Sequence, residues 1–167
     1  LQFDEAIDAL EQAVILDPEY AAPYADIAYA RSLKVWFLIE PMNVGWPSIQ
    51  EYTSKALALE PGNDRARRMA AVSRFYVDRD YQGAIDELHP LLKDAHGLDD
   101  VAAYAVIMQT LGRFDDAVRV YQHGVEVDPL SPRAHWQLGE AYALAGQFGL
   151  AKESLLQAER LGLPASS

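Results

Sequence analysis

The chain has 167 residues, of which 50% are hydrophobic and 23% charged, a balance typical of a folded globular protein. Its formal net charge of -11 repels phosphate backbones and anionic lipid headgroups, which makes nucleic acid and membranes poor partners. There is no cysteine, which excludes disulfides and thiolate chemistry and leaves the compartment open. No apolar run is long enough for membrane insertion.

Helical periodicity of the apolar residues runs along the whole chain. It starts at the first residues, where Phe3, Ala6, Ile7 and Leu10 share a face, so we expect the chain to be a fragment of a longer protein. Proline and glycine breaks divide the pattern into nine predicted helices, at 2–16, 21–37, 47–60, 64–77, 81–93, 98–111, 114–127, 132–145 and 148–161. These make four hairpins behind one unpaired helix.

A short pattern of glycine, an aromatic residue and alanine recurs along the chain. Its copies at 112–117 and 146–151 are 34 residues apart, and weaker copies stand at 80–84 and 2–6. A proline closes several of the predicted helices, because proline cannot continue a helix: Pro18, Pro61 and Pro129. The last copy also carries a longer set of residues in phase, namely Leu138, Gly139, Tyr142, Gly146, Phe148, Ala151 and Ala158.

Together these marks resemble the tetratricopeptide repeat (TPR). The resemblance implies an all-α fold, a right-handed superhelical solenoid of antiparallel helix hairpins with about four and a half repeats. Because each hairpin buries its apolar face only against its neighbours, we expect residues 1–167 to form a single solenoid domain.

Residue types at the repeat positions have physical explanations. Gly139 and Ala151 are small where the two helices of a hairpin cross, which permits axes to approach to about 8 Å. Gly146, like Gly112 one repeat earlier, follows a first helix, where glycine most easily adopts a left-handed conformation. Phe148 and its equivalent Phe114 are expected to fill the gap beside the turn.

The second hairpin is longer than the repeat period. Pro18 and Pro61 are 43 positions apart, and the surplus falls in residues 36–47, which are rich in aromatic and aliphatic side chains. We expect this insert to fold back over a neighbouring turn, because so many apolar groups in water would form a sticky patch. Contact with a partner is the alternative.

No motif indicates catalysis or a cofactor. The histidines, at 89, 96, 123 and 135, lack the spacing of a metal site, and the acidic pairs lie in first helical turns, where they complement the helix dipole. Phosphate-binding glycine loops and nucleophile motifs are absent from the sequence. We therefore predict no catalytic residues, no metal, no cofactor and no enzymatic activity.

The resemblance also implies a binding site, in a concave groove lined by the first helix of each hairpin. Matching by phase assigns ten residues to this groove: Asp26, Tyr29, Met69, Ser73, Tyr76, Gln109, Arg133, Trp136, Gln137 and Glu140. Tyrosine, tryptophan and arginine suit an extended peptide or a partner helix, and the acidic charge favours a neutral or basic protein. The alternative is that the aromatic residues only fill space between helices.

Three functions are compatible with this sequence. The first is a protein–protein interaction scaffold that binds a peptide or partner protein. The second is a regulatory or sensor module of a larger bacterial signalling protein, because residues 20–28 and 128–132 look similar to arrays in nucleotide cyclases and winged-helix regulators. The third is self-association through the apolar first and last helices.

Overall fold

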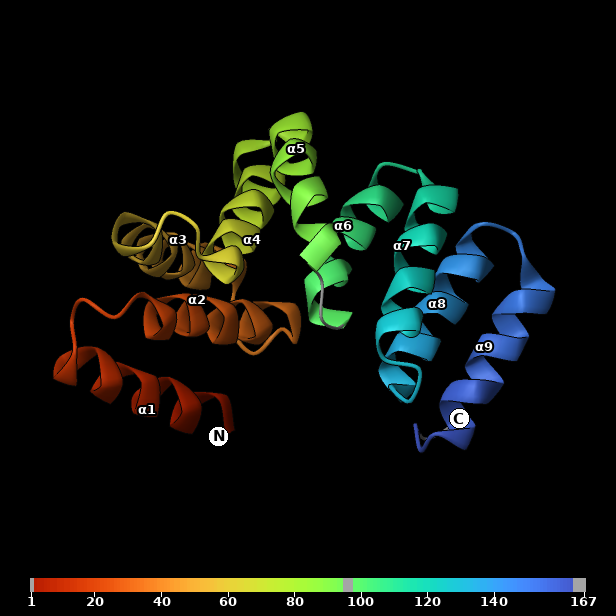
Figure 1. Ribbon diagram of the computed structural model, residues 1–167, viewed down its shortest axis with the longest axis horizontal. Helices are drawn as coiled ribbons and strands as arrows, with labels where there is room; N and C mark the ends of the chain where they lie inside the picture. Colours follow the sequence, from red (N-terminus) through yellow and green to blue (C-terminus); the bar gives the residue numbers. More distant parts are fainter. Residues whose placement is uncertain (1, 95–97, 164–167) are drawn as a thin grey trace. The chain divides into compact units, whose positions relative to one another are not determined.

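The structure is a computed structural model, and it describes residues 2–94 and 98–163. These residues form nine α-helices and no strand (Figure 1). The helices are α1 (Gln2–Leu16), α2 (Ala21–Trp36), α3 (Met42–Leu59), α4 (Asp64–Ser73), α5 (Tyr81–Leu91), α6 (Leu98–Thr110), α7 (Phe114–Val127), α8 (Pro132–Leu144) and α9 (Phe148–Arg160). The predicted all-α fold of helix hairpins is confirmed. None of these nine helices is long and apolar enough to cross a membrane.

Two short segments depart from α-helical geometry. A π-helical segment, Arg74–Asp78, continues α4, and a 3-10 turn, Leu92–Asp94, follows α5. The helices form two compact units, residues 1–87 and 88–167, and the boundary falls within α5. The predicted single domain and its superhelical hand depend on how these units are arranged, so both stay predictions.

In the first unit, α2 packs against α1, α3 and α4. Four alanines of this unit are almost fully buried: Ala25, Ala28, Ala56 and Ala66. Larger buried neighbours such as Tyr24 and Ile27 pack in the same clusters between the helices. The core of this unit is therefore centred on α2.

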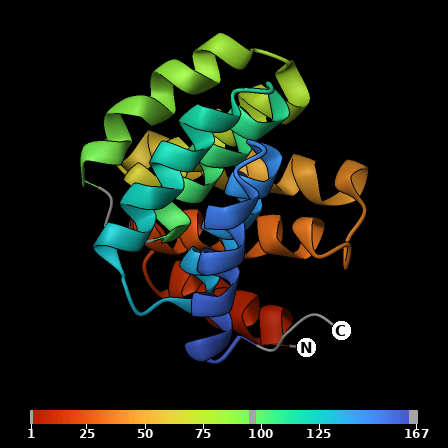
Figure 2. The same cartoon turned by 90° about the vertical axis from the view of Figure 1, so that its right-hand side faces the viewer.

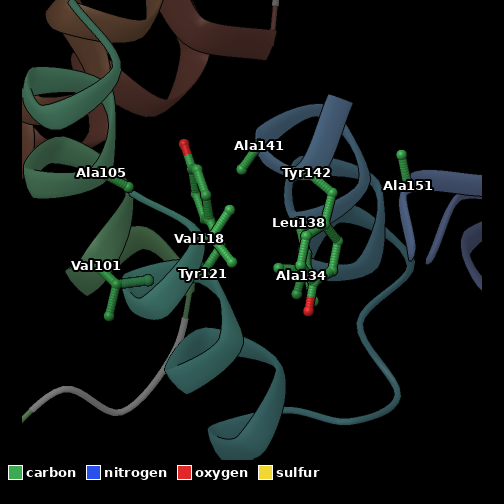
Figure 3. Close-up of a cluster of buried hydrophobic side chains, with 9 residues drawn as sticks. All are labelled: Val101, Ala105, Val118, Tyr121, Ala134, Leu138, Ala141, Tyr142 and Ala151. Atoms are coloured by element: carbon green, nitrogen blue, oxygen red, sulfur yellow. The ribbon is translucent and has the colours of Figure 1, made fainter. Parts of the chain in front are cut away.

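In the second unit, α7 packs between α6 and α8, and α8 pairs with α9. Figure 3 shows Val118 and Tyr121 of α7 between side chains of α6 and α8 in the buried cluster. A Cβ atom on Gly139 would lie 2.7 Å from Leu155 Cγ and 3.2 Å from the Ala151 carbonyl oxygen. The tight crossing expected at Gly139 is confirmed.

As predicted, glycine follows the first helix of two hairpins, α6 and α8. Gly112 and Gly146 have φ values of 73° and 74°. The Gly112 N–H donates to the Gln109 carbonyl, and the Gly146 N–H donates to the Ala143 carbonyl. The next residue in each turn donates back to the carbonyl five positions earlier, which satisfies helix-end acceptors.

Helix α3 begins five residues earlier than predicted. Proline favours the first turn of a helix, which would place the start at Pro47, but Pro47 lies inside α3 and Pro41 precedes its first turn. The added turn carries Trp46, whose side chain is only 4% exposed. Burial of that large ring favours helix across the second half of the insert.

Two packing expectations are wrong. Most of the insert does not pack over a neighbouring turn, because six of its large apolar side chains are about half exposed or more: Trp36, Phe37, Leu38, Ile39, Met42 and Val44. Phe148 does not fill a gap either, since it is 73% exposed, whereas Phe114 is half-buried. A further hairpin follows Phe114 in its unit, but no helix among the described residues follows α9 to cover Phe148.

Candidate functional site

The ten predicted groove residues fall on two separate helix faces, one in each unit. Helices α2 and α4, with the π-helical segment, carry Asp26, Tyr29, Met69, Ser73 and Tyr76. Helices α6 and α8 carry Gln109, Arg133, Trp136, Gln137 and Glu140.

On the first face, an arginine that the sequence did not single out joins two predicted residues. The Arg65 guanidinium lies 4.8 Å from the centre of the Tyr29 ring, and its Nη1 lies 3.2 Å from Asp26 Oδ1. A cation held between a ring face and a carboxylate restrains all three side chains. Arg65 stands in the first turn of α4, where no repeat position marks it, so only the structure identifies it.

Two other residues of this face are packed into the unit. Met69 and Ser73 are each 7% exposed. Ser73 Oγ accepts a hydrogen bond of 2.8 Å from Gln50 Nε2 of α3. These side chains leave little surface for a partner, and their main contribution is to hold α4 against α3.

Tyr76 belongs to an aromatic group. Its ring meets Phe75, Trp36 and Trp46 edge-on, with centroids 4.8, 5.1 and 6.4 Å away. Edge-to-face contacts of this kind stabilise beyond simple burial. The half-buried Tyr76 therefore links the π-helical segment after α4 to the end of α2 and the first turns of α3. The repeat pattern did not indicate the contacts with Trp36 and Trp46.

On the second face, α8 presents its predicted residues along one stripe. Their spacing of three and four positions places Arg133, Trp136, Gln137 and Glu140 on one side of the helix. The opposite side is buried in the core of the unit, through Ala134, Leu138, Ala141 and Tyr142. Trp136 is 37% exposed. On α6, which contacts α8, Gln109 is half-buried.

The Gln137 amide is the least satisfied group on this face. Its side-chain oxygen is shielded from solvent and accepts no hydrogen bond from any residue that the structure describes. Buried acceptors are nearly always paired in folded proteins, so an unpaired one calls for an explanation. Its neighbour in the stripe, Glu140, is an exposed residue, but partial burial of its carboxyl raises the pKa of that group.

This raised pKa predicts how stability depends on pH. Partial burial penalises the charged Glu140 carboxylate in the folded state, so stability falls slightly as pH rises from the usual glutamate pKa of 4.5 through the raised pKa. We expect Glu140→Gln to raise the melting temperature at pH 7, with the difference shrinking toward zero below about pH 4.5. Thermal denaturation at several pH values measures this. A variant less stable than wild type at pH 7 would contradict it.

One open hollow lies elsewhere, beside α4 in the first unit. It has a volume of about 380 Å³ and is lined by Leu57, Pro61, Arg67, Ala70, Arg74 and Glu87. Arg67 Nε lies 2.6 Å from Glu87 Oε1, so an ion pair occupies part of its wall. None of the ten predicted residues lines it.

Antiparallel hairpins with small residues at the crossings and glycine at the turns define a helical repeat protein. The TPR repeat model matches residues 110–146, and the tetratricopeptide repeat model matches residues 132–161. Residues 110–161 therefore match tetratricopeptide repeats, which supports over this part of the chain the family that the sequence pattern predicted. No curated protein sequence matches the chain.

Solved structures with the same fold cover nearly the whole chain. A crystal structure of MamA is 22% identical with a TM-score of 0.61, covering 95% of this chain and 88% of that one. MamA from Desulfovibrio magneticus is 16% identical with a TM-score of 0.63, covering 99% and 88%. YrrB, described as a TPR protein with an unusual peptide-binding site, is 17% identical with a TM-score of 0.59, covering 96% and 78%. These likenesses establish the fold.

Proposed function

We propose that the chain is a protein-interaction scaffold that holds an extended segment of a partner protein against the first helices of its hairpins. The face of α2 and α4 serves in the first unit, and the face of α6 and α8 serves in the second. The partner segment is neutral or basic, because the chain has 25 acidic and 14 basic residues. In this proposal the chain binds a partner protein and does not catalyse a reaction.

The unpaired Gln137 oxygen supports this proposal most directly. A buried acceptor without a partner costs roughly 1–3 kcal/mol, which the half-buried side chain would recover by turning its oxygen toward a peptide N–H. Trp136, the preceding residue, offers a large and rigid apolar surface. The partly desolvated Glu140 carboxylate would gain from a lysine or arginine side chain on the partner.

The similar structure of YrrB is consistent with peptide binding. That protein is described as having an unusual peptide-binding site. At 17% identity the likeness concerns the fold, so the proposal rests on the side chains of this chain.

Peptide selection tests the proposal without knowledge of the natural partner. Short random peptides displayed on phage are selected on the wild-type protein, and the best one is labelled for fluorescence anisotropy. We expect Gln137→Leu and Trp136→Ala each to weaken its binding about 10-fold, since each removes a contact worth about 1.4 kcal/mol.

Gln157 provides the matched control, since it is a half-buried glutamine on α9, the second helix of the same hairpin. Gln157→Leu should bind the peptide like wild type, and helical circular dichroism should be unchanged in all three variants. If wild type and both α8 variants bound the peptide equally, the face of α6 and α8 would not be the peptide-binding site.

Two alternative functions stay predictions. A regulatory or sensor role within a larger bacterial signalling protein would be tested by whether the gene also encodes a nucleotide cyclase or winged-helix domain. Self-association would be tested by sedimentation at several protein concentrations.

A further inference from the structure

The turn between α2 and α3 exposes an unusual concentration of apolar side chains. It lies at the free end of that helix pair (Figure 2, orange, right). We call residues 36–44 the α2–α3 turn. Its exposed fractions are 47% for Trp36, 65% for Phe37, 91% for Leu38, 56% for Ile39, 50% for Met42 and 56% for Val44. Contiguous exposed apolar surface on a folded protein marks an interaction site more often than chance.

The α2–α3 turn has a defined backbone and two aromatic anchors. The N–H groups of Ile39 and Glu40 both donate to the Lys34 carbonyl, at 2.8 and 3.1 Å. The Trp36 ring lies edge-on to Tyr76, and the Phe37 ring stacks on Phe3 of α1 with centroids 6.0 Å apart. A surface held this firmly loses little conformational entropy when it binds.

Leu38 occupies a position that two other hairpins of this chain give to glycine. Its N–H donates to the Val35 carbonyl and the next N–H donates to the Lys34 carbonyl, the same arrangement as at Gly112 and Gly146. Its φ is 56°, in the left-handed region that costs a branched side chain free energy. The chain thus accepts backbone strain at a site where the leucine side chain is 91% exposed and gains almost no burial in return.

Charge around the α2–α3 turn indicates what kind of partner would cover it. Four acidic side chains lie in the turn or on the half of α1 that Phe37 contacts, namely Asp4, Glu5, Asp8 and Glu40, and the nearest bases in the sequence are Arg31 and Lys34. Both bases are ion-paired, Arg31 with Glu11 at 3.6 Å and Lys34 with Asp4 at 2.8 Å. A second copy of the chain would bring equally acidic surroundings against these acids, which opposes self-association through this surface.

We propose that the α2–α3 turn is a second docking surface, adjacent to the face of α2 and α4 through the contact of Trp36 with Tyr76, for a protein segment whose apolar face is bordered by lysine or arginine. An amphipathic basic helix has this chemistry, since its apolar stripe can cover the exposed side chains while its cations meet the surrounding carboxylates. Leu38, at the tip, is the central contact of this surface.

Two synthetic helical peptides of about 18 residues serve as probes. Both carry the same leucine face, with lysines on the polar face of one and glutamates on the other. Isothermal titration calorimetry with wild type should show saturable binding of the lysine peptide and none of the glutamate peptide. We expect Leu38→Gly to weaken binding about 10-fold, the loss for one leucine no longer buried on the partner.

The Leu38→Gly variant is not expected to lose stability. Glycine relieves the left-handed strain at this position, so the melting temperature should equal or exceed that of wild type. The control is Leu130→Gly, which removes a leucine that is 76% exposed in another turn of the chain. It should bind the lysine peptide like wild type.

Three results would overturn the proposal. One is equal affinity of wild type and Leu38→Gly for the lysine peptide. Another is equal binding of both peptides, which would remove the charge argument. The third is sedimentation of wild type as a dimer that Leu38→Gly dissociates, since a second copy would then be the occupant. Gln137→Leu should bind the lysine peptide normally, so this proposal and the proposed function succeed or fail separately.

Discussion

Replacing Gly139 with valine is expected to lower the free energy of unfolding of residues 88–167 by about 3 kcal/mol. Even a single Cβ at this position would meet Leu155 Cγ at 2.7 Å and the Ala151 carbonyl oxygen at 3.2 Å. Valine adds two further methyl groups and a stiff χ1 angle, so α8 and α9 must separate or tilt. Urea denaturation followed by circular dichroism measures the loss.

Gly149 supplies the control for this substitution. It lies in α9 of the same hairpin, and an added Cβ would meet nothing within 4 Å. Gly149→Val is expected to be neutral or slightly stabilising, because valine has a higher helix propensity than glycine. If the two variants lost equal stability, the close approach at Gly139 would not be the cause.

The second large effect is expected at Phe75 in the first unit. Its side chain is 2% exposed, and its ring lies 4.8 Å from the Tyr76 ring and 5.1 Å from the Tyr81 ring. Phe75→Ala should cost about 4 kcal/mol, through lost burial and the cavity that remains. The same denaturation experiment gives the value, and Tyr76 should become more mobile because its closest aromatic neighbour is gone.

Phe148→Ala is the matched test of burial. Phe148 is 73% exposed, so its replacement should change the free energy of unfolding by less than about 0.5 kcal/mol. A loss comparable to that of Phe75→Ala would show that Phe148 is covered in solution, which would restore the packing role that the repeat pattern assigned to it.

These stability effects differ in kind from those expected at the binding surfaces. Gln137 and Leu38 are predicted to matter for binding while costing the fold little, as both carry an unrelieved penalty in the free chain. Replacing Gly139 or Phe75 should destabilise the fold, and neither residue is predicted to contact a partner. The two classes of variant therefore separate loss of binding from loss of folding.

The predicted helices agree well with the structure because their signals are local. Helices α1 and α7 have the predicted bounds, and the glycine turns at Gly112 and Gly146 have the predicted backbone. Apolar spacing and turn residues act within a few positions of each other, so they can be read without knowing the tertiary fold. The start of α3 was missed because burial of Trp46, a tertiary effect, outweighed the proline signal.

Fewer features of the candidate site could be predicted from local sequence patterns. Repeat phase named Asp26 and Tyr29 but not Arg65, the residue that joins them across two helices. Phase also treated Met69 and Ser73 as groove residues, although the structure buries both. The position of a residue within the repeat specifies the side of the helix on which it lies. Whether its side chain is buried or exposed depends on how closely the neighbouring helix approaches.

By itself, the sequence of this protein determined the repeat, the helices, the glycine turns and the small residue at the α8–α9 crossing. These depend on backbone preferences and on periodicity, which act over a few residues. Only the tertiary structure decided the Arg65 contacts, the unpaired Gln137 oxygen and the exposure of the turn around Leu38. Each of these depends on which atoms of other helices lie nearby, and one-dimensional spacing does not specify that distance.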